Sequence, residues 1–310
     1  MKKITISLNP TYLCNFRCDF CYLTKVQLKD RKVLDLAVLR ERLSEIKASG
    51  YLVNHVDLYG GEISLLENCY LEEMDQILFK EAADPTINVI TNLSKVHPYF
   101  LKEHVDLSVS FDFEAREKHE IVLSNILTTN KNIAILMLAS SELIALNTSH
   151  MIETFSSIQN IVSVEIKPYS SNQANQHQVS DLEFEDFIKK WISSEKEKKF
   201  DFINEENIKL ALQGRRNAFS DDHIYINPNG KISVLEFDQN GDEYFLELDS
   251  FQEYLVWTQL EKKRVYKNKI CSDCDYLGKC LTEHYREVVN IKNSCNGFKG
   301  LLDHYKNHIL

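Results

Sequence analysis

The chain has 310 residues, enough for one large domain or two smaller ones. Hydrophobic residues make up 44% of it and charged residues 26%, a composition typical of a soluble globular protein. The 36 basic and 46 acidic side chains give a formal net charge of −10, which argues against a nucleic acid as partner because phosphate binding needs clustered positive charge. No apolar run of about 18 residues predicts a membrane span, and the start of the chain does not read as a signal peptide.

The chain contains eight cysteines, and seven of them fall into two clusters. In a protein without a secretion signal, clustered cysteines indicate metal or redox chemistry rather than disulfides. We therefore expect a cytoplasmic protein that works at low oxygen.

Strands and helices alternate along the first part of the chain. Short segments of alternating or continuous apolar residues predict six strands, at residues 4–8, 53–59, 87–91, 105–111, 133–138 and 162–169. Apolar residues spaced by three and four predict helices between them, at residues 36–49, 65–83, 98–103, 115–128 and 149–157. The run at 133–138 is apolar throughout, which predicts a strand buried on both faces.

Alternation at this spacing predicts parallel strands joined by right-handed crossovers. We therefore expect an α/β fold in which residues 1–180 form a partial (β/α)6 TIM-like barrel. In such folds the chemistry lies at the C-terminal ends of the strands.

The remainder of the chain predicts two further parts. Helices at 181–199 and 205–213 are expected to bridge, over residues 181–222, to a second unit at 223–310. That unit begins with a β-hairpin at 223–234, whose turn is Asn-Pro-Asn-Gly, and a helix around 251–262 follows.

Three thiols follow the first predicted strand in the pattern Cys14-x3-Cys18-x2-Cys21, with Tyr22 directly after them. Thiolates hold zinc ions or iron–sulfur clusters. A structural zinc site requires a fourth cysteine or histidine nearby, which this segment lacks. A cubane cluster with three protein ligands keeps one iron open for a small molecule. Three buried structural cysteines are the alternative, but this loop is polar and aromatic.

This spacing, with an aromatic residue after the third cysteine, resembles the radical S-adenosylmethionine (SAM) enzymes. The resemblance implies that Cys14, Cys18 and Cys21 bind a 4Fe-4S cluster whose fourth iron is chelated by the amino and carboxylate groups of SAM. It implies that one electron cleaves SAM to methionine and a 5′-deoxyadenosyl radical, which abstracts a hydrogen atom from the substrate. The cofactor carries the chemistry and the protein positions it. Tyr22 is expected near the adenine.

Gly60-Gly61-Glu62 ends the second predicted strand. Glycines let backbone approach a ligand closely, and a carboxylate accepts hydrogen bonds from an ammonium group. The alternative is a tight turn with a glutamate that starts a helix. The resemblance assigns these three residues to the amino group of SAM, although the proline usual after the glutamate is Ile63 here.

Two later strand ends also resemble segments that contact SAM. Asn92 and Ser110 are the candidates for its ribose and carboxylate, and Asp112 is a candidate for facing the substrate. Beyond the sixth strand, Lys167 and Tyr169 are expected to face the cavity. A polar loop at 170–178 follows, in which His177 is an alternative catalytic base or part of a solvated linker.

A second thiol group lies near the end of the chain, as Cys271-x2-Cys274-x5-Cys280 with Cys295 further on. Four thiols also suit structural zinc. The hairpin and this spacing resemble the SPASM/twitch extension of radical SAM enzymes, with two ligand positions lacking cysteine: one in 232–236, and His284.

The resemblance therefore implies one auxiliary 4Fe-4S cluster, fully ligated by Cys271, Cys274, Cys280 and Cys295, that carries electrons. His284 is an alternative ligand. The remaining cysteine, Cys69, is expected to be a buried core thiol on the second helix, with a hydrogen-atom donor as the alternative.

Three functions follow from these features. The first is a radical SAM enzyme that modifies a ribosomally made peptide by a crosslink, a thioether or epimerisation. The second is a radical SAM dehydrogenase or epimerase of a sugar or aminocyclitol, and the third is a non-enzymatic metal-binding protein. Either enzyme would need a flavodoxin- or ferredoxin-type electron donor. The first strand starts almost at the first residue, so no winged-helix module that grips a leader peptide is expected.

Overall fold

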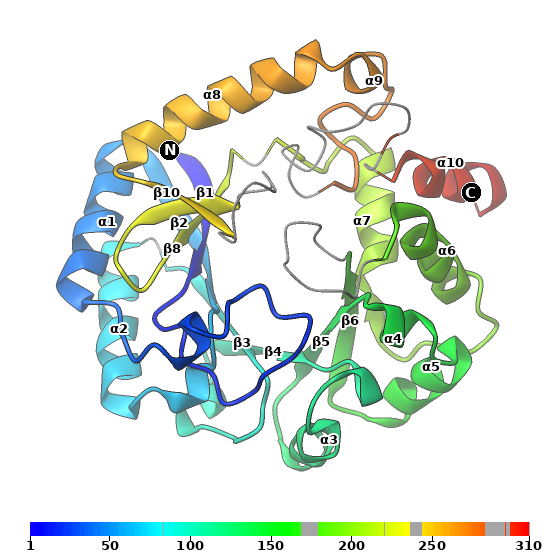
Figure 1. Ribbon diagram of the computed structural model, residues 1–310, viewed down its shortest axis with the longest axis horizontal. Helices are drawn as coiled ribbons and strands as arrows, with labels where there is room; N and C mark the ends of the chain where they lie inside the picture. Colours follow the sequence, from blue (N-terminus) through cyan, green and yellow to red (C-terminus); the bar gives the residue numbers. More distant parts are fainter. Residues whose placement is uncertain are drawn as a thin grey trace.

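The computed structural model describes residues 1–82, 84–168, 179–219, 221–235, 244–282, 295 and 298–309. Within these residues the strands form one ten-stranded sheet in the order β10-β9-β8-β1-β2-β3-β4-β5-β6-β7. The sheet curves around a centre and most helices lie outside it (Figure 1).

The middle of the sheet is the predicted partial barrel. Each of its six strands pairs in parallel with the next along the chain. They are β1 (Lys2–Leu8), β2 (Tyr51–Leu58), β3 (Thr86–Thr91), β4 (Val105–Ser110), β5 (Ile133–Leu138) and β6 (Ile161–Lys167). The predicted α/β barrel fold is therefore confirmed.

The connections between these strands are helical, and they pack on the outer face of the sheet (Figure 1). The α-helices are α1 (Leu36–Ala48), α2 (Asn68–Glu81), α3 (His119–Thr128), α4 (Ser141–Ile144), α5 (Thr148–Ser157), α6 (Asp181–Ile192) and α7 (Ile203–Leu212). Short 3-10 turns stand at Gln27–Lys29, Ile63–Leu65, Pro98–Leu101 and Phe113–Ala115. In α1, Leu39, Leu43 and Ile46 are buried, and the carboxylate of Asp35 caps the first turn by accepting from the Ala37 amide at 2.8 Å.

The predicted hairpin does not form a sheet of its own. β8 (His223–Ile226) pairs in parallel with β1, and β9 (Ile232–Leu235) pairs antiparallel with both β8 and β10 (Phe245–Leu248). The opposite edge is the short strand β7 (Asp201–Phe202), which pairs with β6. The barrel sheet thus continues across the predicted boundary at residue 222, while the division into three parts stays a prediction.

The last helices are α8 (Phe251–Lys267), α9 (Lys269–Ser272) and α10 (Lys299–His308). α8 crosses from the side of α1 to the side of α9 and α10, along the part of the ring that the barrel strands leave open (Figure 1). The carboxylate of Asp221 joins this helix to the sheet, since it binds Lys262 of α8 at 2.6 Å and Lys2 of β1 at 2.9 Å.

Several predicted helices were too long. The helix expected at 181–199 ends at Ile192, where the Ser193 hydroxyl binds the Lys189 carbonyl at 2.6 Å and caps the last turn. The helices predicted at 65–83 and 115–128 begin later, at Asn68 and His119, each after a short 3-10 turn, and the segment 98–103 contains only a 3-10 turn.

The prediction that the strand at 133–138 is buried on both faces was wrong. Alternate residues of β5 are half-exposed, because its inner face borders a cavity rather than packed side chains. In the described part of the chain, no helix has the length and apolar character needed to cross a membrane.

Candidate active site around the cysteine loop

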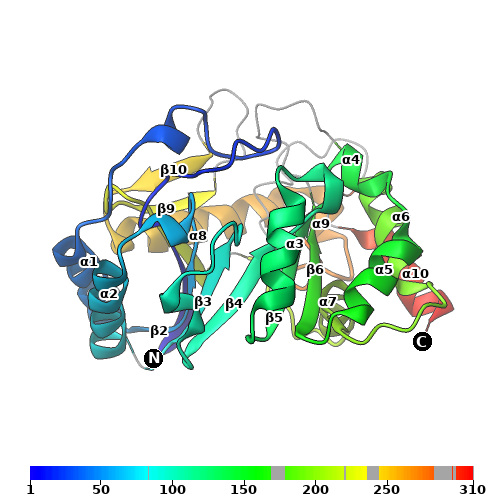
Figure 2. The same ribbon diagram turned by 90° about the horizontal axis from the view of Figure 1, so that it is seen from below.

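A cavity of about 570 Å³ opens at the C-terminal ends of the parallel strands. The segment that follows β1 lies at this end of the barrel, together with β9 and β10 (Figure 2). Most residues predicted to hold a cluster and SAM line this one cavity, namely Cys14, Cys18, Cys21, Tyr22, Gly60, Gly61, Asn92 and Ser110. Glu62, which was also predicted to contact SAM, does not line the cavity.

The cysteine loop is fixed by its own backbone. The Cys14 amide donates to the Leu28 carbonyl at 3.2 Å, and the Cys21 amide donates to the Cys18 carbonyl at 3.1 Å. Phe16 and Phe20 are buried and anchor the loop to the interior. These contacts hold the loop in one conformation, in which all three cysteines border the same cavity.

Burial raises the pKa of all three thiols, and that of Cys21 reaches about 12. Three donors oppose this effect. The Phe16 amide and the Asn92 side chain lie 3.4 and 3.9 Å from the sulfur of Cys14, and Arg116 lies 3.6 Å from that of Cys18. Donors and a cation around thiolates stabilise their charged form.

These three thiols fit a cluster with three protein ligands, because they share one cavity and receive donors from backbone, amide and guanidinium groups. The described residues contain no three histidine, cysteine, aspartate or glutamate side chains grouped to hold a single metal ion.

Sequence reasoning missed Arg116. Its Nε and Nη2 atoms both lie 2.6 Å from Oδ2 of Asp112, and its guanidinium covers the ring of Phe20 at 5.2 Å. Burial lowers the pKa of Arg116, but Asp112 and the thiols of Cys18 and Cys21 outweigh burial and raise it, so the guanidinium stays charged. The spacing of four residues between Asp112 and Arg116 was the available signal.

Asp112 does not face a substrate. Its side chain is fully buried, and its second oxygen accepts from the Leu138 amide at 2.5 Å. It holds Arg116 against the cysteine loop and fixes the end of β5.

The two glycines after β2 are required by the close approach of the cysteine loop. The Gly61 amide donates to the Thr11 carbonyl at 2.9 Å, and the Glu62 amide donates to that of Leu13 at 2.8 Å. A Cβ atom on Gly61 would lie 2.2 Å from the Leu13 carbonyl oxygen, and one on Gly60 would lie 2.5 Å from that of Thr11. Gly60 also has a φ of +134°.

Glu62 is wholly buried and binds the protein itself. Its Oε1 accepts from the Ser64 amide at 2.9 Å and from the Thr91 hydroxyl at 2.7 Å, and its Oε2 accepts from the Asn92 amide at 2.8 Å. The carboxylate caps the turn at Ile63–Leu65 and ties the end of β2 to the end of β3. Its contact with SAM stays a prediction.

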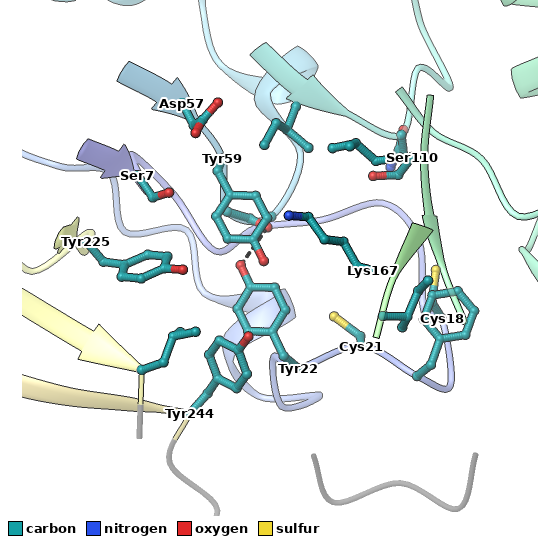
Figure 3. Close-up of a pocket in the computed structure, with 18 of the residues that line it drawn as sticks. Ser7, Cys18, Cys21, Tyr22, Asp57, Tyr59, Ser110, Lys167, Tyr225 and Tyr244 are labelled. Carbon is teal, nitrogen blue, oxygen red and sulfur yellow. Dashed lines mark hydrogen bonds between the residues drawn. The ribbon is translucent and has the colours of Figure 1, made fainter. Parts of the chain in front are cut away.

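Tyr22 lies at the centre of an aromatic group in the cavity wall (Figure 3). Its ring stacks on Tyr59 at 5.4 Å between centroids and contacts Tyr244 at 4.5 Å. Its hydroxyl donates to the Gly60 carbonyl at 3.3 Å. Nearby, the Asn92 amide donates to Asn15 at 2.9 Å, which connects the end of β3 to the cysteine loop.

The second thiol group lies behind another part of the cavity wall. Burial, and then the thiols of Cys295, Cys280 and Cys274, raise the pKa of Cys271 to about 11, so these three sulfur atoms lie near that of Cys271. Arg216, which lines the cavity, donates to the Cys280 carbonyl at 3.0 Å. This donor set fits a cluster with four protein ligands.

The remaining predicted residues divide into two sets. Lys167 lines the cavity as expected and pairs with Glu165 at 2.9 Å, while Tyr169, His177 and His284 lie outside the described residues. The prediction that Cys69 is a buried core thiol was wrong. It lies exposed near the start of α2, and its thiol donates to Glu67 at 3.5 Å, because the buried face of this helix is formed by Leu71, Met74 and Leu78.

Comparison with solved structures finds the same fold. A structure described as native anSMEcpe with bound AdoMet and Cp18Cys peptide aligns with a TM-score of 0.70 at 12% identity, covering 98% of this chain and 97% of that one. Streptococcus suis SuiB bound to S-adenosylmethionine aligns with a TM-score of 0.62 at 15% identity, covering 96% and 76%. SuiB bound to its precursor peptide SuiA gives 0.61 at 15%, covering 94% and 74%.

Comparison with curated protein sequences gives no match. Comparison with family models matches residues 8–122 to the Radical SAM superfamily. This segment runs from the end of β1 to the first turns of α3 and includes the cysteine loop, the glycine turn and Arg116. The match to the Radical SAM superfamily therefore covers residues 8–122, the part of the chain that contributes the cysteine loop to the cavity.

Proposed function

We propose that this protein is a radical SAM enzyme that modifies a ribosomally made peptide. One observation carries the proposal: three thiols, Tyr22 and the Gly60–Gly61 turn border a single cavity at the strand ends, inside the segment that matches the superfamily. A protein that used these thiols only for structure would not need a cavity of this size beside them.

The cluster and SAM, when bound, supply a 5′-deoxyadenosyl radical that removes a hydrogen atom from the substrate. Cys14, Cys18 and Cys21 would hold the cluster, and Arg116 would stabilise the thiolate of Cys18 through its charge. Tyr22, Asn92 and Ser110 would hold the nucleotide and amino-acid parts of SAM. The buried aromatic and aliphatic wall would exclude water from the reacting atoms.

The second thiol group completes the proposal. Cys271, Cys274, Cys280 and Cys295 would hold an auxiliary 4Fe-4S cluster in a reduced SPASM/twitch-like unit. Such a cluster, fully ligated by protein, would carry an electron rather than bind substrate. Arg216 touches both the cavity and the Cys280 carbonyl, which gives a short protein connection between the two regions. The first electron would come from a flavodoxin- or ferredoxin-type donor in the cytoplasm.

Two considerations support a peptide as substrate. Structures of the same fold are described with peptides bound, namely anSMEcpe with Cp18Cys and SuiB with SuiA. The cavity is also lined by both polar and apolar side chains, as a peptide with mixed side chains requires.

The polar side chains also support the alternative, oxidation or epimerisation of an amino sugar or aminocyclitol. Ser7, Asp57 and Lys167 would then bind hydroxyl and amino groups.

The proposal is tested by anaerobic reconstitution with iron, sulfide, SAM and a reductant. Wild type should form 5′-deoxyadenosine and bind about eight irons per chain, four for each cubane. The triple variant Cys14→Ala/Cys18→Ala/Cys21→Ala should form none and retain about four irons. Cys69→Ala is the matched control, because it removes an exposed thiol outside the cavity and should keep the full iron content.

Wild type that forms no more 5′-deoxyadenosine than the triple variant would contradict both enzymatic functions and leave the metal-binding one. Incubation with peptide libraries or with amino sugars, followed by mass spectrometry, separates the two enzymatic substrates.

A further inference from the structure

Polar side chains cover the wall of the cavity opposite the cysteine loop. They come from three adjacent parallel strands in the same register, because Ser7 of β1 pairs with Asp57 of β2 on one side and with Tyr225 of β8 on the other. All three side chains line the cavity, and Figure 3 shows them on the side away from Cys18 and Cys21. This wall holds no predicted cluster or SAM ligand.

The carboxylate of Asp57 is only half satisfied by the protein. Its Oδ1 lies 2.7 Å from the amide nitrogen of Asn88 and 3.2 Å from Nε2 of His55. Among the described residues, Oδ2 has no hydrogen-bond partner. The side chain is 18% exposed, through the cavity that it lines. A mostly buried acceptor without a hydrogen-bond partner destabilises the folded protein, unless a ligand or solvent donates a hydrogen bond to it.

Asp57 is charged at neutral pH. Burial raises the pKa of this carboxyl, but hydrogen bonds from His55 and Asn88 outweigh burial, and the net shift is below the ordinary value. Two neighbouring basic side chains contact other residues, since Lys167 binds Glu165 at 2.9 Å and His223 lies 3.0 Å from the Ser7 hydroxyl.

Two aromatic side chains lie in the same wall as Asp57. Tyr59 lies two residues further along β2 and so projects on the same side of the sheet, and Tyr225 stands on the other side of Ser7 (Figure 3). Both rings line the cavity. A carboxylate in a wall that also carries aromatic rings suits an ammonium group, because both the negative charge and the rings attract it.

We infer that Asp57, in the cavity wall that also carries Tyr59 and Tyr225, binds a protonated primary amine of the substrate. The inference rests on the proposed function and narrows its substrate class. In a peptide the amine is a lysine side chain or a free N-terminus, and in a small molecule it is an amino substituent. The bound amine would face the cysteine loop across the cavity, so that carbon atoms near it lie between the two walls.

The test is calorimetric binding to the anaerobically reconstituted protein, without turnover. The probes are N-acetyl-lysine methylamide, its norleucine counterpart, alanyl-alanine amide with a free or acetylated N-terminus, and glucosamine. At least one amine should bind, and its uncharged counterpart should bind at least tenfold more weakly. The probe that binds best identifies the source of the amine.

Asp57→Asn should weaken binding of that amine by roughly 10- to 100-fold, the usual effect of losing one charged hydrogen bond. Asp222→Asn is the matched control, because Asp222 lines the same cavity but already accepts a hydrogen bond from Asn217 at 3.0 Å. It should change the affinity less than twofold. Equal losses in both variants would indicate a general effect of negative charge and overturn the inference.

A second pair of variants keeps the test valid if Asp57→Asn does not fold. Tyr225→Leu should weaken amine binding by roughly 3- to 10-fold, whereas Tyr225→Phe, which keeps the ring face, should retain it. Unchanged affinity in Tyr225→Leu and Asp57→Asn would overturn the inference.

The two proposals fail separately. Wild type that cleaves SAM while no amine probe binds would overturn the amine site and leave the proposed function. Wild type that binds an amine through Asp57 without cleaving SAM would overturn the proposed function and leave the amine site.

Discussion

The two thiol groups of this chain lie in different surroundings. The first borders an open cavity, and a buried cation and two nitrogen donors lie within 3.9 Å of its sulfur atoms. The second has four thiols, of which Cys271 and Cys280 are buried, and in the described part none of them lines the cavity. The difference indicates that the number of thiols must be considered together with their surroundings. Three thiols beside a cavity suit a site that binds a further molecule, and four thiols away from the cavity suit a site that does not.

Replacement of Gly61 should have the largest effect and should act on the first group alone. In Gly61→Ala the new methyl would overlap the backbone of Tyr12 and Leu13, at 2.5 and 2.2 Å. We expect a loss of more than about 3 kcal/mol of unfolding free energy and loss of the first cluster's iron. Urea denaturation and iron analysis measure both. Gly50→Ala is the comparison, since its methyl meets nothing within 4 Å and only the φ of +86° costs about 1–2 kcal/mol. Full iron content in Gly61→Ala would contradict the account of this turn.

Arg116→Met should be the next most damaging change. It leaves the fully buried Asp112 without its cation, and breaking a buried pair costs about 3–5 kcal/mol. It also removes the donor 3.6 Å from Cys18, so the first cluster should be lost more readily to a chelator. The double variant Arg116→Met/Asp112→Asn should recover much of the stability but not the chelator resistance. If it recovers both, Arg116 serves only to neutralise Asp112.

Cys271→Ala/Cys274→Ala addresses the second group. About four irons per chain should be lost, while 5′-deoxyadenosine formation should continue in part, because the first group is intact. Formation of modified substrate should stop, since the oxidising step would lack its electron carrier. Mass spectrometry of product together with chromatography of 5′-deoxyadenosine separates the two outcomes. Undiminished product would refute the electron-carrier role.

The smallest effect concerns Asp221, which joins the barrel to the helix leading to the second group. Burial raises the pKa of this carboxyl, but hydrogen bonds from Lys262, Lys2 and Asn217 outweigh it and hold the pKa well below the ordinary value. A carboxyl lowered in this way adds stability above its unfolded pKa, near 3.9, and loses it as the pH falls toward the folded value.

We therefore expect wild type to lose about 1 kcal/mol more than Asp221→Asn between pH 5 and pH 2.5, where the unfolded carboxyl takes up its proton and the folded one does not, as urea midpoints would measure. Parallel losses in the two proteins would show that this carboxyl does not set the acid sensitivity.

The sequence predicted the barrel well, because its signals are local. The six parallel strands lie within two residues of their predicted bounds, since alternation or runs of apolar residues mark each of them. β7 and β10 have two and four residues, too few to show a period, and they were missed. The pairing of β8 with β1 joins residues more than 200 positions apart, which no local pattern reveals.

The site divides in the same way. The cysteine spacing and the double glycine lie in continuous motifs, so the sequence alone was enough to identify them as site residues. The interactions of Glu62 with Thr91 and Asn92, and of Arg116 with Cys18, depend on which loops meet in space. The polar wall did leave a trace, since Thr5, Ser7, His55 and Asp57 interrupt strands that a buried parallel sheet would fill with apolar residues.

The position of β8 beside β1 has a consequence for how this protein is made. The strand that carries the cysteine loop is synthesised first, yet its second hydrogen-bonded neighbour is not complete until Ile226. During synthesis, one edge of β1 therefore stays unpaired until more than two hundred further residues have been added. The cysteine loop that follows β1 lacks this support for the same time. We therefore expect stable loading of iron and sulfide at Cys14, Cys18 and Cys21 only after the segment up to Ile226 has been made and β8 has paired with β1.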